Sequence, residues 1–171
     1  GIVAMNRKLD ADTAGELVKI FTEVVIAPDA DEDALSVLSG KSNLRVLLTG
    51  GLPDAKQSGW LTKTVAGGLL VQERDTAMIS VKDLRTVTQR EPTEAELADL
   101  MFAWKVVKHV KSNAIVYARN LSTAGIGMGQ TSRLEAARLA VRKAEATAQE
   151  NGWDEPRTQG SVCASDAFFP F

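Results

Sequence analysis

The sequence predicts an α/β fold, and three observations lead to this prediction. Short apolar segments rich in β-branched residues alternate along the chain with segments whose apolar residues follow helical spacing. That alternation is typical of a largely parallel sheet with helices on its faces. The length of 171 residues is enough for one domain with a sizeable core, and no internal repeat is evident.

The first part of the chain contains three predicted strands, residues 2–5, 24–27 and 44–48. Between the first two, Asp10 or Asp12 can cap a helix. The residues expected on its inner face are Ala14, Leu17, Val18 and Phe21. A shorter helix is predicted around residues 34–38, ending near Gly40.

The middle of the chain differs in composition from the part before it. Residues 50–59 are polar and rich in turn-forming residues, which predicts a boundary or crossover between two lobes, 1–60 and 61–171. Residues 65–71 then predict one strand, with Gly67 and Gly68 at a bulge or a close backbone approach. The following segment, up to Pro92, is expected to be mostly strand and loop.

Thr93 begins the clearest predicted helix, because Glu96 stands three residues later as in a capping box. The residues expected to face the sheet are Leu97, Leu100, Met101, Trp104 and Val107. His109 lies beside this stripe, so we expect a solvated histidine and no catalytic role.

Residues 111–134 are the most informative stretch. A predicted buried strand at residues 114–118 leads to Gly125, Gly127 and Gly129, and then to a helix start at which Ser132 and Glu135 form a capping box. Glycines with this spacing let backbone N–H groups approach an anionic ligand at the helix start, although such turns are also common without any ligand. Arg133 has the unfavourable charge for the helix dipole there, and an anion would explain it.

The predicted helix continues from residue 133 to about residue 150 and stops at Asn151 and Gly152. The residues expected on its inner face are Leu134, Ala137, Val141 and Ala144. Residues 161–167 predict a last strand. Cys163 lies in that apolar strand, so a small buried core residue is the simplest interpretation.

Composition excludes several classes of function. With 20 basic and 22 acidic side chains, no nucleic-acid or anionic membrane surface is indicated, and no apolar run reaches the ~20 residues that span a bilayer. One cysteine and one histidine cannot complete a zinc site. We expect a cytoplasmic protein. The apolar residues at both ends, including the aromatic run 168–171, suggest part of a longer protein.

Four segments carry a resemblance to a known family. They are FTEVVIAPD, GGLLVQERD, KSNAIVYARN with GIGMGQTSRLEAARLA, and GSVCASDAFFPF, in that order along nearly the whole chain. Together they resemble the transformylase domain of the bifunctional family of 5-aminoimidazole-4-carboxamide ribonucleotide (AICAR) transformylase and IMP cyclohydrolase. The resemblance implies two lobes with a cytidine deaminase-like, three-layer α/β/α fold and a mixed sheet, without zinc.

The resemblance also implies a function in purine (IMP) biosynthesis. The family transfers a formyl group from 10-formyltetrahydrofolate to the amine of AICAR, and its full-length members also carry a separate IMP cyclohydrolase domain. A catalytic Lys-His pair is implied upstream of residue 1. Lys108-His109 stands in a different context and does not match that pair.

Five residues match implied ligand contacts. The resemblance implies that Asn113 orients AICAR, that Glu23 and Arg133 face the nucleotide, and that Leu134 and Phe168 face the folate. Four of them have a simpler alternative: local backbone bonding for Asn113, a solvated carboxylate for Glu23, and ordinary packing for Leu134 and Phe168. The family often has aspartate where Glu23 stands.

The resemblance further implies a structural potassium ion near Ser112 and Asp166, and a homodimer with active sites at its interface. Two other functions stay open. The chain could be a nucleotide-binding module without activity, which tight AICAR binding by the chain alone would favour. It could instead mainly supply subunit contacts, which concentration-dependent association without ligand binding would favour.

Overall fold

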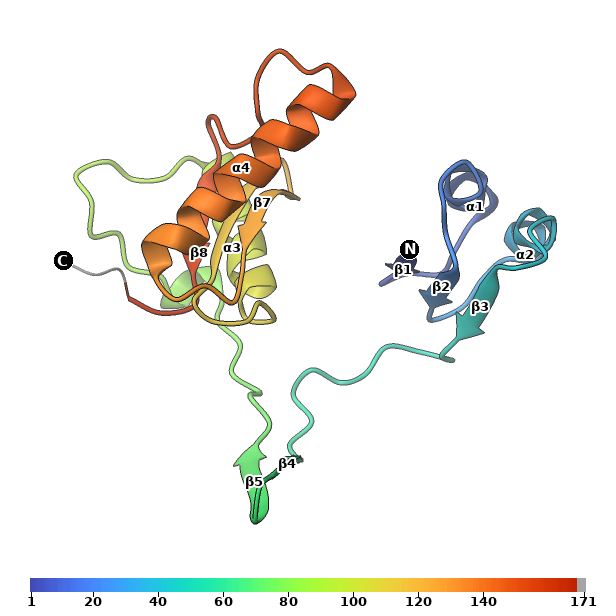
Figure 1. Ribbon diagram of the computed structural model, residues 1–171, viewed down its shortest axis with the longest axis horizontal. Helices are drawn as coiled ribbons and strands as arrows, with labels where there is room; N and C mark the ends of the chain where they lie inside the picture. Colours follow the sequence, from blue (N-terminus) through green and yellow to red (C-terminus); the bar gives the residue numbers. More distant parts are fainter. Residues whose placement is uncertain (169–171) are drawn as a thin grey trace. The chain divides into compact units, whose positions relative to one another are not determined.

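The computed structural model describes residues 1–168 (Figure 1). The chain divides into two compact units, Gly1–Ala77 and Met78–Phe171, and each is described by itself below. The lobe boundary expected after residue 60 falls at the start of the strand that begins at Trp60. The end of the C-terminal aromatic run, residues 169–171, lies outside the described residues.

The first unit contains a parallel sheet, as predicted, with strand order β1-β2-β3. Its elements are β1 (Ile2–Ala4), α1 (Ala11–Leu17), β2 (Val24–Ala27), α2 (Glu32–Ser39) and β3 (Arg45–Leu48). Helix α1 begins where the Asp10 side chain accepts a hydrogen bond from the N–H of Thr13.

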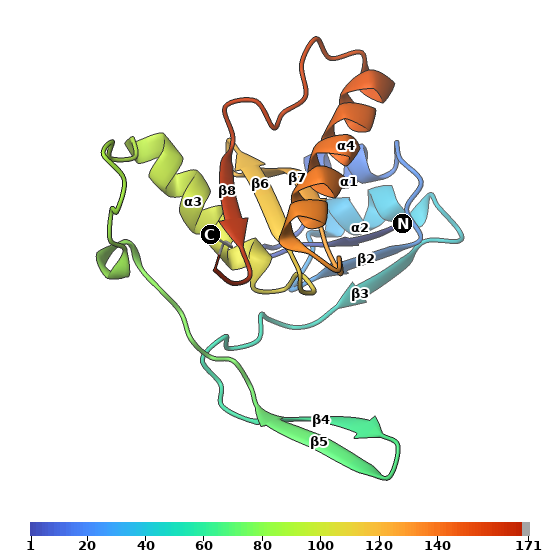
Figure 2. The same cartoon turned by 60° about the vertical axis from the view of Figure 1, so that its left-hand side comes forward.

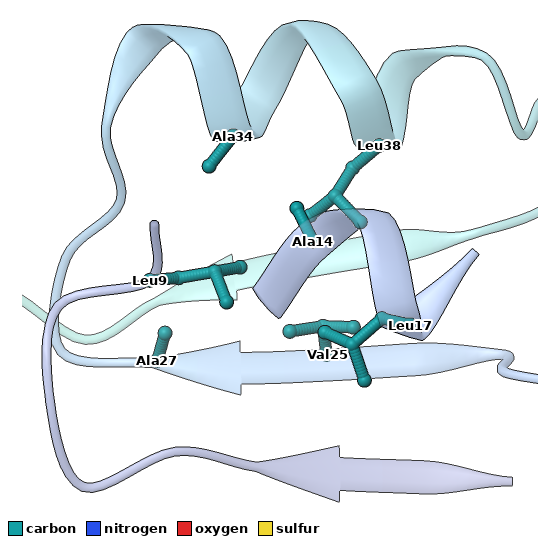
Figure 3. Close-up of a cluster of buried hydrophobic side chains, with 7 residues drawn as sticks. All are labelled: Leu9, Ala14, Leu17, Val25, Ala27, Ala34 and Leu38. Atoms are coloured by element: carbon teal, nitrogen blue, oxygen red, sulfur yellow. The ribbon is translucent and has the colours of Figure 1, made fainter. Parts of the chain in front are cut away.

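Both helices of this unit pack on one face of the sheet (Figure 3). The buried core consists of Leu9, Ala14, Leu17, Val25, Ala27, Ala34 and Leu38. Alternate residues of β2, Val25 and Ala27, point to the helices, as the two-residue period of a strand requires. The inward position predicted for Phe21 is wrong, because α1 ends at Leu17 and Phe21 is exposed.

A hairpin replaces the single strand predicted over residues 65–71. Strands β4 (Trp60–Val65) and β5 (Gly68–Glu73) pair antiparallel and are joined by Ala66 and Gly67. Gly67 has φ +81°, a conformation that glycine adopts without steric cost, so it makes a tight turn and no bulge. Every residue of both strands is exposed.

The second unit contains an antiparallel sheet in the order β7-β6-β8, so the largely parallel sheet predicted for the whole chain is wrong here. A short 3₁₀ helix (Val81–Asp83) precedes its elements, which are α3 (Glu94–Val107), β6 (Ile115–Arg119), β7 (Ser122–Gly127), α4 (Arg133–Asn151) and β8 (Val162–Ser165). The reversal from β6 to β7 occurs at Asn120 and Leu121, both at positive φ. Their N–H groups donate to the carboxylate of the buried Asp99 in α3, at 2.9 and 2.7 Å.

Helices α3 and α4 cover opposite faces of this sheet (Figures 1 and 2). On one face, Ala103 and Val107 of α3 pack on Val116, Ala118 and Ala164 of the sheet. On the other, α4 crosses β7. The second unit is therefore a three-layer α/β/α arrangement, and the chain as a whole is α/β with parallel and antiparallel sheets.

The inner faces of both long helices differ from the prediction. In α4 the buried residues are Ala136, Ala140, Ala144 and Ala148, so of the expected face only Ala144 is buried. Leu134 is 58% exposed. In α3 the buried residues are Asp99, Ala103 and Val107, whereas Trp104 is exposed. Ala103 of α3 and the four buried alanines of α4 lie where the helices contact the sheet, because small side chains let the helices lie close to it.

Candidate functional site at the start of β6, the end of β8 and the start of α4

Gly125 and Gly127 lie inside strand β7, so the glycine-spaced ligand loop predicted there is wrong for these two residues. A Cβ atom at Gly125 would lie 2.4 Å from the carbonyl oxygen of Ala140, and one at Gly127 would lie 1.8 Å from that of Ala136. Close packing against α4 therefore explains both glycines. Gly129 alone follows the strand, with φ +64° and open space around it.

Helix α4 begins with half of the predicted capping box. The Ser132 hydroxyl oxygen accepts a hydrogen bond from the N–H of Glu135 at 3.1 Å. The Glu135 carboxylate accepts a hydrogen bond from Arg138 at 2.7 Å, so it forms an ion pair on the helix surface. This cap fixes the first turn of α4, in which Arg133 stands.

Asp166 is the centre of the hydrogen-bond network at this end of the sheet. Because β6 and β8 run antiparallel with Ile115 opposite Ser165, the start of β6 lies beside the end of β8. Asp166 Oδ1 accepts a hydrogen bond from the N–H of Ala114 at 2.8 Å, and Oδ2 accepts one from the Ser112 hydroxyl. Arg133 Nη2 donates to Oδ1 at 3.2 Å.

These bonds decide the charge of Asp166. Its partial burial alone would raise the pKa of the carboxyl group, but hydrogen bonds from Ser112, Ala114 and Arg133 outweigh burial and the pKa is lowered. Asp166 is therefore an anion at neutral pH. The Asp166 and Arg133 side chains are only 15% and 12% exposed, so the pair is shielded from solvent.

Arg133 is held by two partners. Its Nε donates to the Ser165 hydroxyl oxygen at 2.7 Å, and its Nη2 pairs with Asp166. The Phe168 ring centre lies 6.0 Å from Cζ of Arg133, at the outer limit of a cation–π contact, and this side chain is 78% exposed. The carboxylate supplies the negative charge that the sequence led us to expect from a ligand.

Asn113 lies between two residues that bind Asp166. Its side-chain Nδ2 donates to the carbonyl oxygen of Gln130 at 3.0 Å, a backbone partner 17 residues away and not the local backbone of the simpler alternative. Within residues 1–168, no donor is bonded to its Oδ1. Asn113 is half-buried, and one acceptor remains available for a ligand.

The other predicted site residues are placed as follows. Leu134 adjoins Arg133 with an exposed side chain, so plain core packing is excluded for it within the described chain. Glu23 belongs to the first unit, with an exposed carboxylate that accepts a hydrogen bond from the Gly1 amine at 2.9 Å. His109 is exposed, as predicted, beyond the end of α3.

A cavity of about 610 Å³ in the second unit was not predicted. It lies between α3, β8 and the segment before α3, and Leu97, Leu100, Met101 and Trp104 line it. Most of the apolar stripe that the sequence assigned to sheet packing thus faces this cavity, whereas Val107 packs on the sheet as predicted. Cys163, half-buried in β8, also lines it, and burial raises the pKa of its thiol. None of Asn113, Arg133, Leu134 and Phe168 lines the cavity.

Sequence reasoning missed two members of the network around Asp166, the backbone N–H of Ala114 and the hydroxyl of Ser165. No pattern in the sequence signals a backbone donor. Ser165 next to Asp166, within the predicted strand 161–167, was the available clue. In the described part of the chain, no helix is both long and apolar enough to span a membrane.

Sequence comparison relates the chain to known proteins. The family model described as AICARFT/IMPCHase bienzyme matches residues 1–143. The chain is 59% identical to the bifunctional purine biosynthesis protein PurH of Bradyrhizobium diazoefficiens, 57% to that of Bartonella henselae and 60% to that of Brucella anthropi. Each alignment covers 100% of this chain and 32% of the relative, so the chain spans about a third of the relatives' length.

Proposed function

Because this chain belongs to the AICARFT/IMPCHase bienzyme family, as its motifs predicted, we propose that it forms part of an AICAR transformylase. The full-length protein would move the formyl group of 10-formyltetrahydrofolate to the amine of AICAR in purine biosynthesis. It would also carry IMP cyclohydrolase and work in the cytoplasm. Residues 1–60 and 61–171 would be parts of two cytidine deaminase-like lobes.

The observation that carries this proposal is the network around Asp166, whose carboxylate binds Arg133 and both neighbours of Asn113, while the Phe168 ring lies beside Arg133. Asn113 presents an amide acceptor that suits the carboxamide of AICAR. Arg133 presents its remaining N–H groups to the nucleotide. The exposed side chains of Leu134 and Phe168 offer apolar surface of the kind that the ring system of a folate requires.

These residues would act by positioning. The amine of AICAR is a weak nucleophile, and holding it against the formyl carbon can supply several kcal/mol of the barrier. The new carbon–nitrogen bond forms as the bond between the formyl carbon and the folate nitrogen breaks, and the amine proton passes to that nitrogen. A nucleotide contact of Glu23 stays a prediction of the resemblance. The proton would be handled by the Lys-His pair implied upstream of residue 1.

Potassium is not part of the proposal. Asp166 Oδ2 is bound by Ser112, and Oδ1 is bound by Ala114 and by Arg133, whose positive charge already balances the carboxylate. A potassium ion at the same carboxylate would be repelled by that guanidinium. The Arg133 guanidinium argues against this ion, and a potassium ion near Ser112 and Asp166 stays a prediction of the resemblance.

The test is formyl transfer to AICAR by the intact protein that contains this chain, before and after Asn113→Ala. We expect kcat/KM to fall about tenfold to a hundredfold, the effect of losing one hydrogen bond to the ligand. Asn43→Ala, at an exposed position, is the matched control and should change nothing. Full activity of Asn113→Ala, or no transfer by the wild type, would contradict the proposal.

The exposed hairpin favours a second role, contact with a second copy of the chain in a homodimer. An isolated two-stranded hairpin is marginally stable in water, and this one exposes the large apolar side chains of Trp60, Leu61, Leu69, Leu70 and Val71. Sedimentation of the intact protein over a concentration series tests this role. Leu70→Glu should shift it toward monomer, whereas Lys63→Glu, the cross-strand neighbour, should not. An unchanged monomer–dimer equilibrium in Leu70→Glu would argue against the hairpin.

A further inference from the structure

We propose that Asp166 is the positioning residue of this site, which holds both Arg133 and Asn113 in place for the nucleotide. This inference rests on the proposed function for its consequences in catalysis. Its structural part stands on contacts alone. Asp166 lies outside the residues expected to touch a substrate, and its carboxylate joins three segments that are distant in sequence.

The first step concerns Asn113. The two residues that flank it, Ser112 and Ala114, both donate to the same carboxylate, one to each oxygen. A segment tied at both neighbours of Asn113 has little freedom to rotate that residue. The Asn113 side chain is further tied through Nδ2 to the Gln130 carbonyl. Asp166 thereby fixes the direction in which the Asn113 acceptor points.

The second step concerns Arg133. In the first turn of α4 its positive charge meets the positive end of the helix dipole, which is unfavourable. Its side chain is 12% exposed, so solvent cannot compensate for that charge. The carboxylate at 3.2 Å compensates for it, and the Ser165 hydroxyl at 2.7 Å sets the plane of the guanidinium. Without Asp166 we expect the guanidinium to turn toward water, because its charge would no longer be compensated inside the site.

The two steps give one prediction for ligand binding. Asp166 acts through Arg133 and Asn113, so its loss should affect the same binding step as theirs. In the intact protein, Asp166→Ala should raise the KM for AICAR about tenfold, the effect of losing one charged hydrogen bond in a shielded site. Ser112→Ala, which removes only one of the bonds to Asp166, should cause a smaller rise and guards against a variant that fails to fold.

The control is Asp99→Ala. Asp99 is also a shielded carboxylate with two backbone donors, but it holds the turn between β6 and β7 and touches none of the site residues. It should lower the melting temperature without changing the KM for AICAR. In a double variant with Arg133→Ala, adding Asp166→Ala should raise the KM by less than Asp166→Ala raises it in the wild type, because only the route through Asn113 remains. Effects that multiply would mean that Asp166 does not act through Arg133.

Hydrogen exchange separates this inference from the proposed function. The Ala114 amide donates directly to Asp166, so the amides of residues 112–114 should exchange at least about tenfold faster in Asp166→Ala than in the wild type. If the wild type does not transfer formyl to AICAR, the proposed function fails while this result still supports positioning by Asp166. Unchanged exchange, or an unchanged KM in an active enzyme, would overturn the inference.

Discussion

Replacing Gly127 with alanine tests whether the glycines of β7 serve packing or a ligand. The new Cβ would lie 1.8 Å from the Ala136 carbonyl oxygen, and such contacts do not occur below 3.0 Å. Strand and helix must therefore separate by about 1.2 Å, the difference between these distances. Neither side of the contact is a flexible side chain, so the strain falls on the backbone of α4. Overpacking of this kind costs about 3 kcal/mol, the upper part of its usual range.

Calorimetric unfolding of the wild type and the variant measures this cost. For a unit of this size 1 kcal/mol shifts the melting temperature by about 4–8 °C, so we expect the second unit to melt about 12–24 °C lower. Gly129→Ala, strained by φ +64° but free of clashes, should cost about 1–2 kcal/mol. Gly15→Ala, in open space within α1, should be neutral or stabilising. A shift below about 3 °C for Gly127→Ala would refute the packing explanation.

Two further predictions concern titratable groups. Hydrogen bonds from Arg90 and from Thr93 lower the pKa of Glu96 from 4.5 to about 2, so the first turn of α3 should keep its stability above pH 4.5 and lose it as the pH falls toward 2. Hydrogen exchange against pH measures this, and Glu96→Gln should remove the dependence. Burial raises the pKa of the Cys163 thiol above 9.0, so iodoacetamide should modify it more slowly than free glutathione at neutral pH; an equal rate would contradict its burial.

The sequence predicted the parallel sheet of the first unit well because its signals are local. The strand at residues 24–27 and the helix near residues 34–38 follow from periodicity and turn residues within a few positions. In the second unit, the direction of the strands depended on the turn at Asn120 and Leu121. Leucine at positive φ is an unfavourable choice that no propensity predicts, and the contacts from Asp99 compensate for it.

The wrong face of α4 has a different cause. Hydrophobicity favours Leu134 and Val141 as the inner residues, but the glycines of β7 leave space only for small side chains. The glycines in the strand and the alanines at every fourth helix position form one close contact. Considered alone, the glycines resemble a ligand loop, and the alanines are not recognised as the inner face of the helix. The site could be predicted in part, because Asn113 and Arg133 match family motifs, whereas their meeting at Asp166 depends on the strand register.

The pairing of Arg133 with Asp166 also determines how this site could recognise an anion. The carboxylate cancels the full charge of the guanidinium, so the site keeps only the partial positive charge of the helix start. Attraction by net charge is then weak, and recognition must come from the direction of the remaining N–H groups of Arg133. A lysine at position 133 could not donate to Ser165 and Asp166 in one plane and also offer aligned donors to a ligand. The geometry of the guanidinium, more than its charge, is therefore what Asp166 preserves.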